Sequence, residues 1–272
     1  MLEVNTIIKS SGIIVRPDFK KQSLKFTSTD SEEMFEKNKN NPEMLDIYKD
    51  DNNKLIYNFN SLGYRTKDME WFENKDYILV FGCSYTEGIG LHESDIWHYH
   101  ISKKLNIPIM NLGAGGTGPD YILLNIMKFL KNIRNYPTPK MVVIQWPGEY
   151  RKYFTSLGRL YCHVPAEKLL KFAPSEMYYD AEWYHDRYLP YDSLQKLHNY
   201  NCIQTAKLLL DLAGIKNYHW AWHDDQPNDY DIITKIRTLD KDKARDMAHP
   251  GPDVHMQVYS QIIEGVTKCL NG

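Results

Sequence analysis

Short apolar runs alternate with helix-like stretches over most of this 272-residue sequence. The apolar runs are DYILVFG at residues 76–82, IPIMNLG at 107–113, MVVIQW at 141–146 and NYHWAW at 217–222. Helical patterns cover about 95–105, 120–134, 199–214 and 254–270. Strands that alternate with helices form a parallel sheet covered by helices on both faces. We therefore predict a three-layer α/β/α sandwich, in which an active site lies at the carboxyl ends of the strands.

The expected domain organisation is one main unit with an extension. Residues 1–75 are polar and irregular and are interpreted as an N-terminal extension packed on the main domain, which covers residues 76–272. Within that domain, residues 150–191 are rich in tyrosine and are interpreted as an insertion. Its aromatic rings are suited to stacking on sugar rings or an acyl chain, but packing on the body or an oligomer interface is the favoured reading.

Composition and charge argue against several kinds of partner and structural site. The 33 Lys and Arg balance the 35 Asp and Glu, which gives no electrostatic reason to expect a nucleic acid or an anionic membrane. Four widely spaced cysteines disfavour a disulfide scaffold or a structural zinc site. With no signal-peptide h-region and no long apolar stretch, the sequence predicts a soluble, cytoplasmic protein. It gives no indication of oligomeric state.

The segment GCSYTEGIG at residues 82–90 follows the first predicted strand directly. Its serine, Ser84, lies in a tight turn, which projects a hydroxyl from the end of the sheet and directs nearby backbone N–H groups toward a developing oxyanion. A serine at such a place more often caps a turn or a helix. A nucleophilic role for Ser84 therefore depends on what else the chain supplies.

A base for this serine is found near the C-terminus, in RDMAHPGPDVH at residues 245–255. Asp246 and His249 are three residues apart in a loop that precedes the last predicted helix. A serine nucleophile needs a base, and the base needs a partner that fixes its tautomer and stabilises its cation. An Asp-x-x-His sequence alone is usually a solvated loop, but both motifs together predict a catalytic triad.

These two segments resemble the first and last blocks of the SGNH (GDSL-like) hydrolases, in the same order and at similar separation. The resemblance implies a flavodoxin-like α/β fold, with Ser84 as nucleophile and Asp246 and His249 as its partners. The family's usual aspartate before the serine is Cys83 here. A thiol mechanism is the minor alternative, because strand alternation directs Cys83 away from the face that Ser84 uses.

The resemblance also extends to the oxyanion site. NLGAGGTG at 111–118 resembles the second block, which implies that the N–H groups of Gly116 and Ser84 bind the oxyanion, with Gly115 nearby. A glycine run after a strand is equally explained as a tight turn.

The third block departs from the family pattern, because IQWPGEYR at 144–151 lacks the donor asparagine. Glu149 falls near its place, but an ionised carboxylate cannot donate a hydrogen bond. Gln145 and Arg151 are the candidate substitutes, and together with Gly115 and Glu149 they are expected to line the substrate site. Loss of one oxyanion donor costs about 10²–10³ in rate, which slows an esterase without abolishing it.

Two further features of the sequence are interpreted as structural, not functional. SLGYRTKDMEWF at 61–72 resembles a Gly-Tyr/Phe-Arg segment of some superfamily members, but an arginine beside an aromatic residue, here Arg65, most often makes a structural contact. The paired histidines, His92, His98 and His100, and His219 with His223, come with no HExxH motif or acidic set. We therefore expect no metal and no cofactor.

The expected activity is that of a serine esterase or deacylase. The family resemblance implies small acyl groups, often acetyl, on a small molecule or a glycan. One alternative is an O-acyltransferase that passes the acyl group from the same serine to a sugar hydroxyl, which the altered third block motivates. Another alternative is a binding or structural module that keeps the fold and has lost turnover.

Overall fold

The computed structural model describes residues 2–3, 12–49, 55–148, 151–156, 159–163, 192–222, 230–235 and 242–272. Most of the predicted tyrosine-rich insertion, as well as Glu149 and His223, lies outside the described residues.

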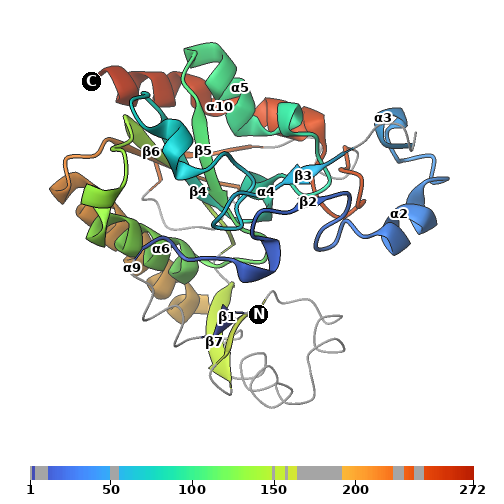
Figure 1. Ribbon diagram of the computed structural model, residues 1–272, viewed down its shortest axis with the longest axis horizontal. Coiled ribbons are helices and arrows are strands. Elements are labelled where there is room, and N and C mark those ends of the chain that lie inside the picture. Colours follow the sequence, from blue (N-terminus) through green and yellow to red (C-terminus); the bar gives the residue numbers. More distant parts are fainter. Residues whose placement is uncertain are drawn as a thin grey trace.

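A five-stranded parallel sheet forms the centre of the protein (Figure 1). Its strands, in sheet order, are β10 (Ile232–Ile233), β9 (Asn217–Ala221), β6 (Met141–Trp146), β4 (Ile78–Gly82) and β5 (Ile109–Gly113). Numbered along the chain within this sheet, the order is 2-1-3-4-5, that of flavodoxin-like folds. This confirms the predicted fold class.

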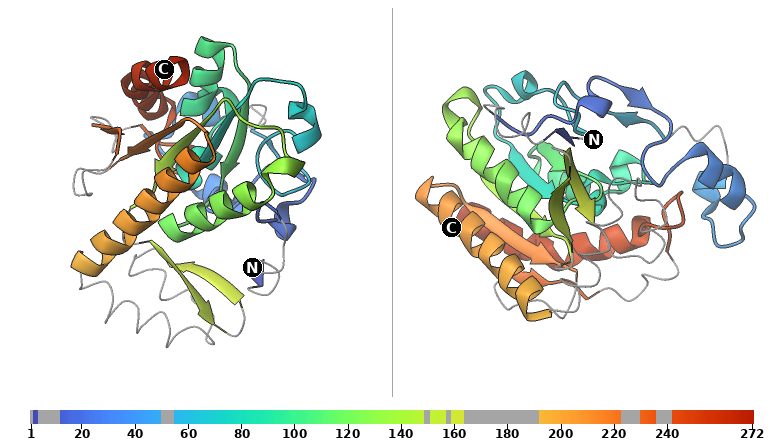
Figure 2. Two further views of the ribbon diagram at one scale, coloured as in Figure 1. Left: turned by 90° about the vertical axis from the view of Figure 1, so that its left-hand side faces the viewer. Right: turned by 90° about the horizontal axis from the view of Figure 1, so that it is seen from below.

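Helices cover both faces of the sheet and complete the three layers. One face packs against α5 (Trp97–Leu105) and α10 (Pro252–Asn271), the other against α6 (Pro119–Lys131) and α9 (Asp192–Leu212). Figure 1 shows these two pairs on opposite sides of the sheet, and Figure 2 shows α6 and α9 side by side.

Strand β4 shows why the core is divided in two. Its residues are all buried, and successive side chains point to opposite faces of a strand. Leu79 and Phe81 lie in the core beneath α6 and α9, whereas Ile78 and Val80 lie in the core beneath α5 and α10. A continuous apolar run is therefore required, as is typical of a parallel strand buried on both faces.

The N-terminal segment contributes to both cores. Ile13 and Ile14 are buried with the α6 and α9 core, and Tyr48 and Tyr57 with the α5 and α10 core. Its elements are η1 (Pro17–Phe19), β2 (Ser23–Leu24), α2 (Glu32–Asn38), α3 (Asp46–Lys49), β3 (Tyr57–Asn58) and η2 (Met69–Phe72). Strands β2 and β3 pair antiparallel. The boundary near residue 75 stays a prediction, but side chains on its two sides share the same cores.

The remaining elements are short. They are α4 (Ser84–Glu87), η3 (Glu93–Asp95), η4 (Ile133–Asn135) and an antiparallel sheet of β1 (Leu2–Glu3), β8 (Arg159–His163) and β7 (Lys152–Ser156). Strands β7, β8 and β10 were not predicted from the sequence. The predicted start of α9, residue 199, is seven residues late, because the helix begins at Asp192. In the described part of the chain, none of the helices combines the length and apolar character needed to cross a membrane.

Three buried histidines make the stability of the fold sensitive to acid. Burial lowers the pKa of His98, His219 and His255 to about 3. A histidine in the unfolded chain has a pKa of about 6.5, so below that pH the unfolded state binds protons that the folded state does not. We expect the free energy of unfolding to fall as the pH is lowered from about 6.5 toward about 3, by up to about 1.4 kcal/mol per pH unit for each histidine. Urea denaturation at a series of pH values measures this slope.

His255→Asn is the matched variant, because it keeps an acceptor for the N–H of Trp97, which now donates to His255 Nδ1 over 3.2 Å. It should remove about one third of the slope. A free energy of unfolding that stays constant between about pH 6.5 and about pH 4.5 would contradict the account.

Candidate active site

Ser84 is the first residue of α4, and a single residue separates it from the carboxyl end of β4. Cys83, in extended conformation, is the N-cap, and Gly88 closes the helix with a φ of 77°. As the first residue of a helix, Ser84 has an N–H group without an intrahelical acceptor. Ser84 is 3% exposed as a whole residue, and no residue of the described part hydrogen-bonds its hydroxyl. The turn thus leaves both groups of Ser84 available for chemistry.

Gln145 at the end of the neighbouring strand β6 supports this turn. Its Oε1 accepts hydrogen bonds from the Cys83 N–H (3.0 Å), the Cys83 thiol (3.1 Å) and the Thr86 hydroxyl (3.2 Å). Its Nε2 donates to the carbonyl of Trp146 over 2.8 Å. Gln145 was a predicted candidate for the substitute oxyanion donor. In this structure both ends of its amide are bonded inside the protein, and its contacts are those of a support for the nucleophile turn.

Asp246 and His249 form a bonded pair in the loop before α10. His249 Nδ1 lies 2.6 Å from Asp246 Oδ2, and Oδ1 of the same carboxylate accepts the N–H groups of Ala248 and His249 over 3.1 and 3.0 Å. Burial opposes ionisation of Asp246, but the hydrogen bonds and the charge of His249, with a hydrogen bond from Thr29, outweigh it and lower the pKa of Asp246. The carboxylate is thus set to orient the imidazole and to stabilise its cation.

This loop packs against the segment that follows α4. The N–H of Arg245 donates to the carbonyl of Gly90 over 3.0 Å. Gly90 has a φ of 77°, and a Cβ there would lie 2.7 Å from the Cβ of Ala244, so only glycine allows this approach. Tyr85, the residue after Ser84, contacts the ring of His249 edge-on, with centroids 5.7 Å apart. The structure therefore brings the two predicted motifs, more than 150 positions apart, to one place.

The glycine run after β5 lies beside Ser84. A Cβ on Gly115 would be 3.9 Å from the Cβ of Ser84. The Gly115 N–H already donates to Glu87 Oε2 over 2.5 Å, so it is not available to a substrate in this conformation. Gly116 has a φ of 73°, and within the described ranges its N–H has no acceptor. Of the two glycines, Gly116 is therefore the one whose donor is available.

Glu87 is held in turn by the N-terminal segment. Its Oε1 lies 3.0 Å from Nη1 of Arg16, and its side chain is 1% exposed.

Arg151 is another residue predicted to line the substrate site. Its carbonyl oxygen lies 2.7 Å from the position that a Cβ on Gly118 would take. It therefore adjoins the end of the glycine run through its backbone.

Several residues of the site carried no recognisable signal in the sequence. The hydroxyl of Thr29 donates to Asp246 Oδ2 over 2.6 Å, and the carboxylate of Asp30 pairs with Arg245. Thr29 and Asp30 precede their partners by 217 and 215 positions and lie in no motif. Trp222, directly after β9, packs on Tyr85 with centroids 4.5 Å apart.

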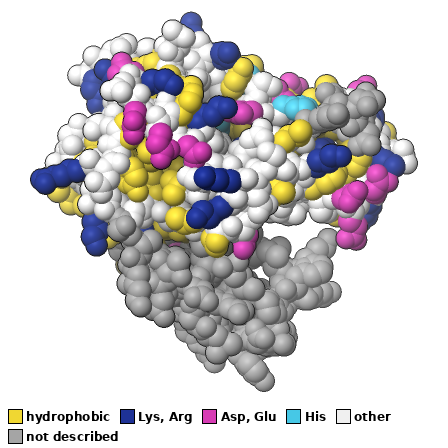
Figure 3. All heavy atoms as spheres, viewed as in Figure 1, with side chains coloured by type: hydrophobic (Ala, Val, Ile, Leu, Met, Phe, Trp, Pro, Cys, Tyr) yellow, Lys and Arg dark blue, Asp and Glu magenta, His cyan; other side chains and the backbone are white. Residues whose placement is uncertain are grey.

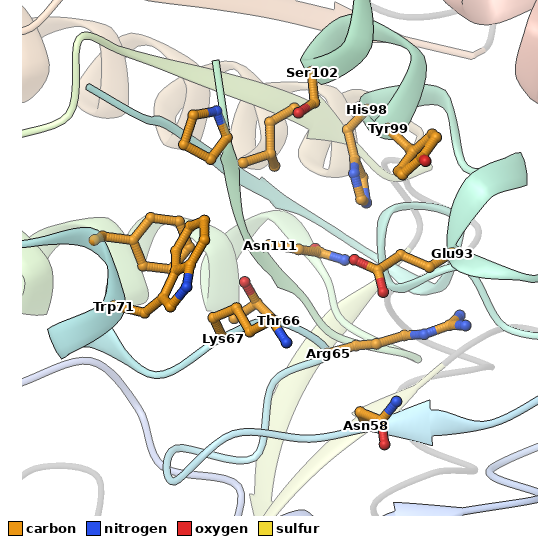
Figure 4. Close-up of a pocket in the computed structure, with 13 residues that line it drawn as sticks. Asn58, Arg65, Thr66, Lys67, Trp71, Glu93, His98, Tyr99, Ser102 and Asn111 are labelled. Carbon is orange, nitrogen blue, oxygen red and sulfur yellow. The ribbon is translucent and has the colours of Figure 1, made fainter. Parts of the chain in front are cut away.

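A pocket of about 250 Å³ lies elsewhere, beside β5 and between α5 and η2 (Figure 4). Its lining includes Trp71 and Tyr99 but none of the three predicted triad residues. Arg65 in its wall is buried and donates to the carbonyls of Gly88 (2.6 Å) and Leu91 (2.8 Å). These contacts agree with a structural role for Arg65, which ties the segment before β4 to the loop after α4.

Comparisons with known proteins were made on sequence and on structure. No family model matches the sequence, and no curated protein is similar to it. One similar solved structure is an acetyl xylan esterase (Est2A) from the rumen bacterium Butyrivibrio proteoclasticus, with a TM-score of 0.45 and 12% identity over 72% of this chain and 64% of that one. Another is a putative lipolytic protein of the G-D-S-L family from Desulfitobacterium hafniense DCB-2, with a TM-score of 0.29 and 14% identity over 69% of this chain and 98% of that one. Both TM-scores are below 0.5, so the functional assignment rests on the chain's own residues.

Replacement of Gln145 tests its support of the nucleophile turn. Gln145→Leu leaves the buried Cys83 N–H without an acceptor, and a buried unpaired donor costs about 1–3 kcal/mol. We expect the free energy of unfolding, measured by urea denaturation, to fall by that amount. Gln22→Leu, at an exposed glutamine, is the control and should have little effect. Equal stability of the two variants would show that the Gln145 hydrogen bonds do not stabilise the turn.

Proposed function

We propose that the protein is a serine esterase or deacylase in which Ser84 is the nucleophile, His249 the base and Asp246 the residue that orients the base. The observation that carries this proposal is the packing of a bonded Asp246–His249 pair on Tyr85, directly beside Ser84. In this proposal the hydroxyl at the end of β4 and the imidazole from the C-terminal loop act together. The orienting carboxylate lies on the Nδ1 side of the imidazole, so Nε2 remains to take a proton.

The reaction proceeds through an acyl-enzyme. Ser84 Oγ attacks the ester carbonyl while His249 removes its proton, and the N–H groups of Ser84 and Gly116 bind the oxyanion. Collapse of the tetrahedral intermediate expels the alcohol, which takes the proton from His249. Water then attacks the acyl-serine with His249 again as base, and release of the carboxylic acid restores the enzyme.

The proposed substrates are small acyl esters, with acetyl groups on a carbohydrate as the leading class. This class is implied by the resemblance of residues 82–90 and 245–255 to the hydrolase blocks. Tyr85 supports it, because a half-buried aromatic ring beside the pair suits packing against a sugar ring. We propose no nucleic-acid partner, and the face drawn in Figure 3 has basic and acidic side chains interspersed.

Cys83 is the competing nucleophile, and its contacts argue against that role. Its thiol is buried and donates to Gln145 Oε1 over 3.1 Å, beneath the turn. A reactive cysteine is partly exposed and lies near positive charge, whereas buried structural cysteines are inert. The thiol therefore replaces the family's usual aspartate as a packing and hydrogen-bonding group.

Hydrolysis of p-nitrophenyl acetate and acetylated sugars by alanine variants tests the assignment. We expect Ser84→Ala and His249→Ala each to lower kcat/KM by about 10³-fold or more. Cys83→Ala, the matched control in the same turn, should keep activity within about tenfold of the wild type. Activity that survives in both Ser84→Ala and His249→Ala would remove this mechanism.

Product analysis separates the alternatives. With an acyl donor and a glycan acceptor present, an esterase releases free acid, whereas an O-acyltransferase forms an acylated glycan. If the folded wild type turns over neither kind of substrate and a glycan ligand still binds, the chain is a binding module on a hydrolase fold.

A further inference from the structure

The tight turn at residues 27–30 brings the N-terminal segment to the acid-base pair. Thr29 Oγ1 donates to Asp246 Oδ2 over 2.6 Å and lies 3.4 Å from His249 Nδ1. The hydroxyl therefore shares the carboxylate oxygen that His249 uses. A residue of the predicted extension thus contacts both the orienting acid and the base.

This turn has a defined shape. Thr27 and Asp30 exchange both backbone hydrogen bonds, over 2.8 and 3.0 Å. Ser28, the second residue of the turn, adopts the left-handed backbone conformation, with a φ of 55°. The two residues at the tip of the turn are Ser28 and Thr29, so the position of Thr29 follows from the position of the turn.

A buried ion pair fixes the turn to the C-terminal loop. Arg245 Nε donates to Asp30 Oδ1 over 2.9 Å, and its Nη2 donates to Asp30 Oδ2 over 2.6 Å. Asp30 is fully buried, and Arg245 is 6% exposed. A two-pronged pair of this kind sets orientation as well as distance. Because Asp30 adjoins Thr29 and Arg245 adjoins Asp246, the ion pair also aligns the hydroxyl with the carboxylate.

The same ion pair is connected to the nucleophile loop. The hydroxyl of Tyr57 donates to Asp30 Oδ2 and accepts the N–H of Gly90 over 2.7 Å. The carbonyl of Gly90 accepts the N–H of Arg245. Asp30, Tyr57, Gly90 and Arg245 thus form a closed ring of hydrogen bonds, which we call the Asp30 ring. It joins the turn, the nucleophile loop and the acid-base loop.

We propose that Thr29 is a positioning residue of the active site, whose hydroxyl holds the Asp246 carboxylate against the Nδ1 of His249, and that the N-terminal segment is therefore part of the catalytic apparatus. The proposal rests on the esterase function proposed above. Asp246 then has four donors: two backbone N–H groups on Oδ1, and the imidazole and the Thr29 hydroxyl on Oδ2. A carboxylate bonded at every side cannot rotate away from its base.

The hydroxyl also favours the ionised acid, because a hydrogen bond to a carboxylate stabilises the charged form. Burial alone raises the pKa of Asp246, whereas His249 and then Thr29 lower it. Removal of the hydroxyl should therefore raise the pKa of Asp246.

Thr29→Val and Thr29→Ser, assayed on p-nitrophenyl acetate across pH, test the proposal. The valine variant should lower kcat about five- to tenfold with little change in KM. The serine variant keeps a hydroxyl and should restore kcat. Thr267→Val is the matched control, because its hydroxyl donates within α10 to the carbonyl of Ile263, remote in sequence from every residue of the site.

A second measurement does not depend on turnover. In protein labelled with ¹³C at the aspartate carboxyls, the Asp246 signal, assigned by its loss in Asp246→Asn, should titrate at higher pH in Thr29→Val than in the wild type or Thr29→Ser. If the wild type hydrolyses no ester but this shift occurs, the proposed function fails and the role of Thr29 stands. If the Asp246 titration is unchanged in Thr29→Val, even with a lower kcat, Thr29 is merely structural and the proposal is overturned.

Discussion

The buried ion pair between Asp30 and Arg245 is the contact on which the arrangement of the site depends. It lies in the Asp30 ring, where the N-terminal turn, the loop after Ser84 and the loop that bears His249 meet. Removing one partner of such a pair typically costs about 3–5 kcal/mol, because the other charge is left buried and unpaired. The sheet places Ser84 at the end of β4, but this ring brings the acid-base loop to it.

The parallel sheet was predictable from the sequence because burial on both faces requires continuous apolar runs, which β4 and β6 show plainly. Strand β10 was missed because two residues, Ile232 and Ile233, are too few to give any periodicity. The N-terminal segment was interpreted as an extension because its polar sequence has no repeating pattern. Its attachment depends on single contacts, such as Asp30 with Arg245, between residues 215 positions apart.

In the candidate site, too, some residues could be predicted from the sequence and others could not. Ser84, Asp246 and His249 could be predicted as site residues because each lies in a short local motif, and the structure brings those motifs together. Gln145 was noticed as a polar residue at a strand end, but the sequence does not reveal that its amide turns toward Cys83 and Thr86. Thr29 lies in no motif at all. Local patterns thus predict candidate reacting groups, whereas the residues that hold them are set by tertiary packing.

The central claim is that Ser84 is activated by His249. The most direct measurement is the rate of labelling by a fluorophosphonate, with the modified residue identified by peptide mass mapping, in the wild type and in His249→Ala. The account predicts a label on Ser84 in the wild type and labelling slower by about 100-fold or more without the imidazole. A label on Cys83, or labelling of Ser84 at an equal rate in both proteins, would contradict it.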